Sequence, residues 1–188
     1  MNRSADSRSA GRWLPLAAFV VLGILLAAGV WMTRDGDRDT IPSPLIGKSA
    51  PEFSLPVLHE PTRNVTLAQL RGAPFVLNVW GSWCAACRDE HPVLTRFAES
   101  RQVRVIGYNW KDEPADALRW LERYGNPYYI VLSDIEGRTA IDWGVYGAPE
   151  TYLVDADGVI RWKFVGPLTE DVVQSQLLPE LAKAEAGS

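Results

Sequence analysis

Cysteine and histidine are scarce in this sequence, which has two of each in 188 residues. Internal repeats and low-complexity segments are missing, and the 15 glycines and 13 prolines are too few for a collagen-like or disordered chain. With 47% hydrophobic and 22% charged residues, the composition is that of one folded domain with a full core. A domain of this size does not require a disulfide for its stability, so we interpret the cysteine pair as a chemically reactive site and not as a structural cross-link.

An excess of positive charge is also missing, since the net charge is −4. Residues 1–33 hold three arginines and one acidic residue, so the remaining chain carries 16 basic and 22 acidic residues, a net charge of −6. An acidic domain repels phosphate backbones. The charge therefore argues against nucleic acid as a partner.

Long hydrophobic runs are absent with one exception, residues 13–32, which contain no charged residue. These 20 positions, at about 1.5 Å per residue in a helix, match the ~30 Å hydrocarbon core of a bilayer. Three arginines precede the run and two follow it, which favours a cytoplasmic N-terminus. We therefore predict a cytoplasmic segment 1–12, a transmembrane anchor 13–32, an extended linker 33–44 and a folded domain 45–188.

The alternative interpretation of residues 13–32 is a cleaved signal peptide, because Ala27, Ala28 and Gly29 are small residues of the kind that a signal peptidase accepts. The run is longer than the usual signal core, and Trp13 and Trp31 bracket it as interfacial anchors do. Both interpretations export the domain that follows.

The folded part is predicted to be an α/β domain with a mixed sheet. Two apolar, β-branched runs, 74–80 and 103–110, are separated by an amphipathic segment, 85–100, which predicts a β-α-β unit with parallel strands. An Asp-Gly turn predicts an antiparallel hairpin near the C-terminus. The other predicted strands cover 53–58, 65–67, 128–132, 150–155 and 159–165, and the other predicted helices cover 114–124, 137–143 and 169–185, the last interrupted near Pro179. The first two strands form an N-terminal hairpin.

Cys84 and Cys87 form a C-x-x-C motif directly after a predicted strand, in the first turn of the next helix. Unpaired N–H groups and the helix dipole stabilise a thiolate there, and the thiolate is the nucleophile of disulfide exchange. The pattern therefore predicts a redox site, with Cys84 as the more exposed nucleophile and Cys87 as the buried resolving thiol.

Two other interpretations of the cysteines stay open. The pair could be a permanent disulfide of an exported protein, or it could bind zinc together with His91, one turn beyond Cys87, and His59. A second C-x-x-C or an H-x-x-x-H motif is missing, so the sequence gives zinc no further support.

The segment 78–92 (NVWGSWCAACRDEHP) resembles the active site of membrane-anchored thioredoxin-like proteins. Together with 125–128 (GNPY) and 144–151 (GVYGAPET), it resembles the DsbE/CcmG group of thiol:disulfide interchange proteins of cytochrome c maturation. The likeness runs from about Leu45 to Pro179. It implies a thioredoxin-like fold in the periplasm, held by a single-pass anchor in the bacterial inner membrane.

The resemblance also implies a function. The protein would reduce the haem-binding cysteines of apocytochrome c, directly or through an assembly partner, with electrons from a transmembrane thiol reductase. No metal or cofactor is expected. The implied catalytic residues are Cys84, Cys87 and Glu90, and the implied substrate-binding residues are Trp83, Ala148, Pro149 and Glu150.

Within that resemblance, Pro149 matches a cis proline opposite the disulfide, where it exposes the preceding backbone to an extended substrate. A carboxylate at Glu90, one turn after Cys87, would raise the pKa of that thiol and could relay its proton, and Glu150 is a second acid nearby. Trp80 and Trp83 flank the thiols, and Trp80 could equally be core.

Two positions depart from the pattern of these proteins. Ala85 stands where the group often carries a proline, which leaves the redox potential open. Asn78 stands six residues before Cys84, where thioredoxins carry a buried carboxylate. Glu90 is therefore the predicted proton carrier.

Three other functions compete with the reductase. A general oxidase of exported proteins usually has a histidine between its cysteines, and here Ala85 and Ala86 carry no charge. A copper chaperone on this fold needs a distant third ligand, commonly histidine, and none follows His91. A thiol peroxidase uses a different cysteine motif. General thiol:disulfide exchange is kept as the main alternative, with the copper chaperone after it.

Overall fold

A computed structural model describes residues 10–34, 43–100 and 103–187 of the chain, which divides into the units Met1–Asp39 and Thr40–Ser188. Helix α1 (Ala10–Arg34) lies in the first unit, and its apolar side chains between residues 15 and 29 are exposed. Within the described residues, none of the helices combines the length and apolar character that a membrane crossing requires. Most of the predicted segments 1–12 and 33–44 lies outside the described residues.

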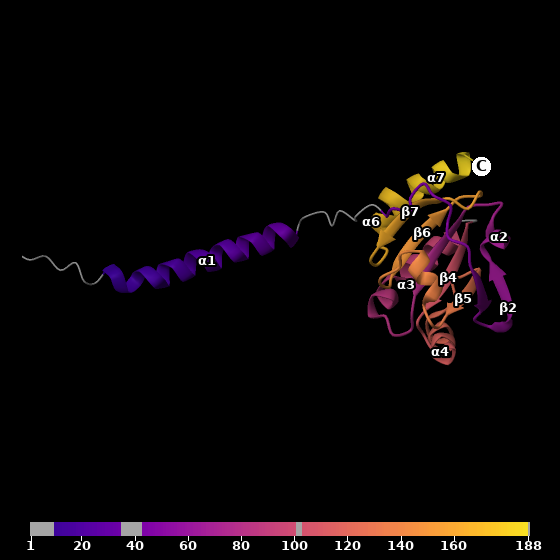
Figure 1. Cartoon of the computed structure of the whole chain (residues 1–188), viewed down its shortest axis with the longest axis horizontal. Helices are drawn as coiled ribbons and strands as arrows, with labels where there is room; N and C mark the ends of the chain where they lie inside the picture. Colours follow the sequence, from indigo (N-terminus) through magenta and orange to yellow (C-terminus); the bar gives the residue numbers. More distant parts are fainter. Residues whose placement is uncertain (1–9, 35–42, 101–102, 188) are drawn as a thin grey trace, which may run out of the picture. The chain divides into compact units, whose positions relative to one another are not determined.

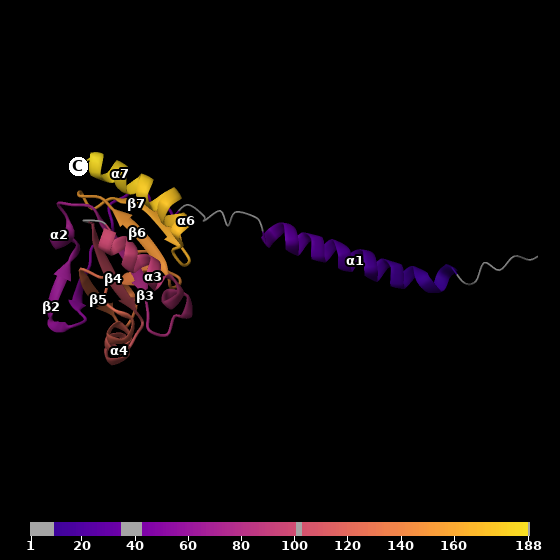
Figure 2. The same cartoon turned by 180° about the vertical axis from the view of Figure 1, so that it is seen from behind.

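The second unit is an α/β domain with a mixed sheet, as predicted (Figures 1 and 2). Its strands are β1 (Ser54–Val57), β2 (Glu60–Thr66), β3 (Phe75–Trp80), β4 (Arg104–Trp110), β5 (Ile130–Asp134), β6 (Glu150–Val154) and β7 (Ile160–Val165). Its helices are α2 (Leu67–Leu70), α3 (Ala85–Ser100), α4 (Pro114–Tyr124), α5 (Arg138–Asp142), α6 (Glu170–Val172) and α7 (Leu178–Ala186), with a π-helical turn, Val173–Leu177, between the last two.

The seven strands follow the order β2-β1-β5-β4-β3-β6-β7. β3 pairs with β4, and β4 with β5, in parallel, which confirms the predicted crossover through α3. The remaining pairs are antiparallel, including the predicted hairpin of β6 and β7. The predicted N-terminal hairpin is also confirmed, but its second strand differs from the prediction: β2 spans Glu60–Thr66 and not 65–67, and Leu67 begins α2. The hairpin joins the central sheet where Val57 pairs with Leu132.

The central strand β3 is buried along its whole length because both faces of the sheet are covered. Val76 and Trp80 belong to the core beneath α3, α4 and α7, whereas Phe75, Leu77 and Val79 belong to the core on the other face, with α2 and α5. This alternation is the two-residue period of a strand. Helix α3 lies in front of the sheet in Figure 2, and its first turn follows the end of β3.

The C-terminal helical segment runs from Glu170 to Ala186, close to the predicted 169–185. Thr169 caps its start, because its side chain accepts a hydrogen bond from the Val172 N–H. The predicted interruption takes the form of the π-helical turn, which ends just before Pro179. Proline has no N–H to donate, so the regular i→i−4 ladder is broken at this point.

Candidate active site

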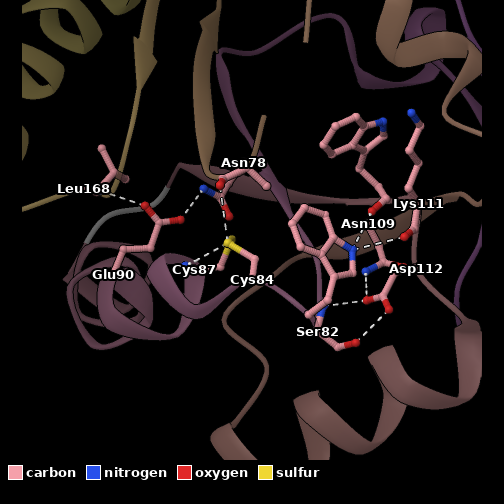
Figure 3. The surroundings of a disulfide bond; sticks show 12 residues. Asn78, Ser82, Cys84, Cys87, Glu90, Asn109, Lys111, Asp112 and Leu168 are labelled. Carbon is pink, nitrogen blue, oxygen red and sulfur yellow. Dashed lines mark hydrogen bonds between the residues drawn. A yellow bond between two sulfur atoms is a disulfide. The ribbon is translucent and has the colours of Figure 1, made fainter. Parts of the chain in front are cut away.

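Cys84 and Cys87 form a disulfide at the start of α3 (Figure 3). The helix begins at Ala85, so Cys84 occupies the N-cap position, and its sulfur accepts a hydrogen bond from the Cys87 N–H at 3.1 Å. Sulfur thus takes the place of the side-chain oxygen that usually caps a helix. The same N–H and the helix dipole stabilise a thiolate on Cys84 once the disulfide is reduced.

Both cysteines are buried, although Cys84 is the more exposed of the two, at 5% against 2% for Cys87. The order agrees with the predicted roles, but the difference is small in the oxidised protein. Cys84 Sγ lies 3.4 Å from the carbonyl oxygen of Ala148, and the Ala148–Pro149 peptide bond is cis, as predicted. The structure therefore brings together two segments that are 64 residues apart, with the backbone of Ala148 beside the nucleophile.

The loop before Cys84 is held by Asp112, a buried residue that the sequence did not point to. Asp112 accepts hydrogen bonds from the Ser82 N–H at 2.6 Å, the Ser82 hydroxyl at 2.7 Å and the Asn109 amide at 2.8 Å. Figure 3 shows its carboxylate facing Ser82. The end of β4 thereby fixes the loop that carries the nucleophile.

Trp83 is 53% exposed beside Cys84, and its role in shaping a substrate groove stays a prediction. Its indole N–H donates to the carbonyl oxygens of Lys111 at 3.0 Å and Trp110 at 3.3 Å, so the ring is held in place. Gly81 makes this ring position possible, since a Cβ there would lie 2.5 Å from the indole nitrogen. Trp80, by contrast, is fully buried and belongs to the core.

Glu90 is buried inside α3, and its carboxylate accepts two hydrogen bonds (Figure 3). One comes from the Asn78 amide at 2.9 Å and the other from the Leu168 N–H at 2.7 Å. Asn78 also donates to the Thr151 hydroxyl and accepts from the Tyr128 hydroxyl. Asn78, which stands where thioredoxins carry a buried carboxylate, is thus hydrogen-bonded directly to Glu90, the predicted proton carrier.

Burial raises the pKa of Glu90 from 4.5 to about 7, against the opposing effect of the two hydrogen bonds from Leu168 and Asn78. Both partners are donors, which favours the ionised carboxylate, whereas the loss of water favours the protonated acid. A carboxyl group with a pKa near neutrality can take up and release a proton under physiological conditions. Its predicted effect on the Cys87 thiol stays a prediction.

Glu150 is fully buried beneath the segment that leads to the cis proline. Its Oε1 accepts the backbone N–H groups of Tyr146 at 3.0 Å and Gly147 at 3.2 Å, and its Oε2 accepts the Tyr152 hydroxyl at 2.9 Å. Its carboxylate is directed into the domain and not toward solvent, unlike the substrate contact that the sequence led us to expect. Glu150 binds the loop that carries Ala148.

His91, the candidate zinc ligand of the sequence, packs its ring edge-on against Trp120 at 4.6 Å, and its Nε2 lies 3.2 Å from the Gly125 carbonyl oxygen. Burial lowers the pKa of His91, against the opposing effect of its hydrogen bonds to the backbone of Gly125 and Tyr124. Among the described residues, no group of three or more metal-ligating side chains is arranged to hold an ion.

Comparison with known proteins places this arrangement in a family. The redoxin family model matches residues 45–178. DsbE, a thiol:disulfide interchange protein of Xylella fastidiosa, is 52% identical over 174 residues, which cover 91% of this chain and 88% of that protein. The chain belongs to the DsbE family of redoxins. DsbE of Pseudomonas aeruginosa is 47% identical over 166 residues, covering 88% of this chain and 89% of its own.

Solved structures agree with this DsbE-family fold. A secreted thiol-disulfide isomerase from Corynebacterium glutamicum superimposes with a TM-score of 0.62 at 26% identity, covering 71% of this chain and 85% of its own. A thio-disulfide isomerase from Thermus thermophilus gives a TM-score of 0.59 at 29% identity, covering 72% and 96%. The domain is therefore thioredoxin-like, and the DsbE-family chain is a protein-disulfide oxidoreductase.

Proposed function

We propose that this chain is a membrane-anchored reductase that supplies electrons to the haem-binding cysteines of apocytochrome c, or of an assembly partner, in the periplasm. The observation that carries the proposal is the position of Cys84 at the N-cap of α3, beside the half-buried backbone of Ala148. A nucleophilic thiolate and a peptide-binding backbone are the two parts that thiol:disulfide exchange with a polypeptide requires.

Reduction of a substrate disulfide then proceeds in two exchanges. The Cys84 thiolate attacks one substrate sulfur, the substrate disulfide breaks, and its other sulfur leaves as a thiolate. Cys87 loses its proton and attacks Cys84 Sγ, which forms the Cys84–Cys87 disulfide and releases the second substrate thiolate. Two electrons pass to the substrate, whose two thiolates take up one proton from Cys87 and one from solvent. A transmembrane thiol reductase is the proposed source of the electrons that reset the site.

Glu90 is proposed as the carrier of the Cys87 proton. The two residues are three apart on α3, which puts them on one face of the helix. The pKa of Glu90, at about 7, lets it accept a proton as Cys87 ionises and release it afterwards. Asn78, which donates to the Glu90 carboxylate, holds that group in place but has no titratable proton.

The proposed direction of electron flow rests on the residues between the cysteines. Ala85 and Ala86 carry no charge, so no cation in this loop adds to the stability of the Cys84 thiolate. A disulfide becomes strongly oxidising when its reduced form is specially stabilised. The loop therefore favours a reductant over an oxidase of exported proteins.

The proposed anchor in the bacterial inner membrane rests on the uncharged run 13–32 and the arginines before it. This run extends at both ends beyond the side chains that the structure describes, which are those of residues 15–29. The domain from residue 45 onward makes up about three quarters of the chain, so the Xylella match over 91% extends into the residues before it. The N-terminal segment is therefore part of what the relatives share.

The proposal is tested by deleting the gene and measuring holocytochrome c by its haem absorbance. We expect holocytochrome c to be lost, to return with the wild-type gene or with added thiol, and not to return with Cys84→Ser. Undiminished holocytochrome c, together with altered disulfides in many exported proteins, would instead support general thiol:disulfide exchange.

A further inference from the structure

Lys163 and Glu150 form a buried ion pair on neighbouring strands, β7 and β6. Lys163 Nζ lies 2.9 Å from Glu150 Oε2, and the two side chains are only 6% and 0% exposed. Lys163 stands opposite Tyr152 in the register of the strands, two positions along β6 from Glu150. Lysine is rarely buried, because removing its charge from water is costly unless the charge is paired. The position of this lysine therefore needs an explanation.

Most contacts of the pair lie on one short segment, Gly144 to Gly147. The others are with Tyr152, whose hydroxyl donates to Glu150 Oε2 at 2.9 Å and whose ring centre lies 5.0 Å from Lys163 Nζ. Lys163 Nζ donates to the Gly144 carbonyl oxygen at 2.8 Å and lies 5.0 Å from the ring centre of Tyr146. Glu150 accepts the N–H groups of Tyr146 and Gly147 through its other oxygen. One cation and one anion thus bind the backbone of this segment at both ends.

That segment leads directly to the backbone beside the nucleophile. Ala148 follows it, with its carbonyl oxygen 3.4 Å from Cys84 Sγ, and the Pro149 carbonyl oxygen accepts the Gly166 N–H at 3.0 Å. Tyr146 is 73% exposed although Lys163 lies against its ring, so an aromatic surface stands two residues from Ala148. An exposed, oriented aromatic ring is a common contact for polypeptide partners.

We propose that Lys163 is a positioning residue that holds residues 144–149, through Glu150 and the ring of Tyr146, in the conformation that receives a polypeptide substrate. The proposal rests on the proposed function of the Ala148 backbone in substrate binding. Stability alone does not account for the pair, since apolar residues of similar volume often replace a buried ion pair without loss. A methionine in place of Lys163 would fill its volume but would leave the Gly144 carbonyl and the Glu150 carboxylate without the cation.

The test compares Lys163→Met with Arg161→Met in the full-length chain. Arg161 is the matched control because it lies on the same strand and pairs with a buried carboxylate, Asp155, at 2.6 Å, away from the loop. Two substrates are reduced by each variant: a disulfide-linked cysteine peptide with a fluorophore and quencher, and 2-hydroxyethyl disulfide, which is too small to lie along the loop.

For Lys163→Met we expect KM for the peptide to rise on the order of tenfold with kcat retained, because binding common to ground and transition states is lost. The kcat/KM for the peptide, divided by the kcat/KM for 2-hydroxyethyl disulfide, should fall by the same factor. Arg161→Met should keep the wild-type ratio. A folded Lys163→Met variant with the wild-type ratio would overturn the proposal, since a merely structural lysine would not separate the two substrates.

If Lys163→Met does not fold, the double variant Lys163→Met, Glu150→Gln leaves no unpaired charge in the core. Its glutamine oxygen still accepts from Tyr146 and Gly147, while Gly144 and the Tyr146 ring lack the cation. A raised peptide KM again supports the proposal, and a wild-type KM rejects it. Failure of the wild-type chain to reduce either disulfide would contradict the proposed function instead, so the two failures are distinguishable.

Discussion

At the scale of single residues, the two cysteines differ because of where α3 begins. Cys84 is the N-cap residue, and its sulfur already accepts a hydrogen bond from the Cys87 N–H. The same N–H would stabilise the negative charge of a Cys84 thiolate. Cys87 lies one turn inside the helix and is buried against the core. These positions support the proposed roles of Cys84 as the nucleophile and Cys87 as the resolving thiol.

This difference predicts how the single cysteine variants behave. Cys87→Ala should accumulate a mixed disulfide with its partner, because Cys84 still attacks but no second thiol releases the product. Cys84→Ala should accumulate none. The two variants are compared on a non-reducing gel after acid quenching, and reduction with a thiol provides the control. Equal trapping by both variants would show that the assigned roles are wrong.

The carboxyl group of Glu90 predicts a dependence of stability on pH. Its pKa is about 7 in the folded chain and 4.5 as the ordinary value, so the folded state binds the extra proton between these pH values. The stabilisation is complete below pH 4.5 and is lost as the pH rises through 7, by about 3 kcal/mol in total. Because Glu90→Gln has no titrating proton, its unfolding free energy should lack this decline.

The measurement is urea unfolding of oxidised wild type and Glu90→Gln between pH 4 and pH 8. The stability of the variant relative to wild type should rise with pH, and parallel curves would contradict a buried, titrating Glu90. Thiol titration in a Cys84→Ala background addresses the catalytic part separately. Glu90→Gln should lower the pKa of Cys87 if the carboxylate acts on that thiol, and superimposable titrations would exclude the interaction.

At the scale of the elements, the active site depends on the end of β4 as much as on α3. Lys111, directly after this strand, has a φ of 47°, which is unusual for a residue other than glycine. This turn presents the carbonyl oxygen of Lys111 to Trp83 and the carboxylate of Asp112 to Ser82. The loop between β4 and α4 thereby holds the segment that leads to Cys84.

The contacts of Asp112 predict a large effect of its removal. Asp112→Ala leaves two partly buried donors on Ser82 and one buried donor on Asn109 without their acceptor, which should lower the free energy of unfolding by about 3 kcal/mol. Alkylation of Cys84 by iodoacetamide should also change in rate, since its loop is released. Asp116→Ala is the control, because its exposed ion pair with Arg119 contributes about 1 kcal/mol or less. Equal losses of stability in the two variants would contradict the conclusion that Asp112 holds the loop before Cys84.

Much of this arrangement was predictable from local patterns. The apolar runs placed β3 and β4, the amphipathic segment 85–100 matches α3 in full, and the Asp-Gly turn gave the hairpin of β6 and β7. Strand β5 begins two residues later than predicted, because Asn126 accepts the Tyr128 N–H in a turn before the strand. Such a turn is a side-chain contact that hydrophobic periodicity does not register.

The long-range contacts of the site were not predictable in the same way. Asp112 and Lys163 look like ordinary surface charges in the sequence, and only the folded structure shows which backbone groups they contact. Glu90 was indicated by the resemblance to the DsbE/CcmG group, but its hydrogen bond to Asn78 depends on how α3 packs on β3. Polar contacts between distant elements carry no periodic signal.

At the scale of the whole molecule, the chain consists of two units with different surfaces. The domain Thr40–Ser188 has its own two cores, one on each face of the sheet, and the net charge of the chain after residue 33 is negative. Helix α1 exposes eight large apolar side chains between residues 16 and 26. Transfer of each of these side chains from water to an apolar environment would contribute about 1.5 kcal/mol or more of free energy. This free energy is not gained while the side chains are exposed to water.

The two units predict how the chain distributes in a cell. If residues 13–32 span the membrane as proposed, full-length protein should stay in the membrane fraction after a wash in alkaline carbonate, which strips peripheral proteins, because the bilayer itself would hold that segment. A chain that starts at residue 40 and is exported by a cleavable signal should be released from the periplasm as a folded protein, because the cores lie within this unit. If full-length protein is instead recovered as a shortened, soluble form, residues 13–32 are a cleaved signal, and the reductase acts free in the periplasm.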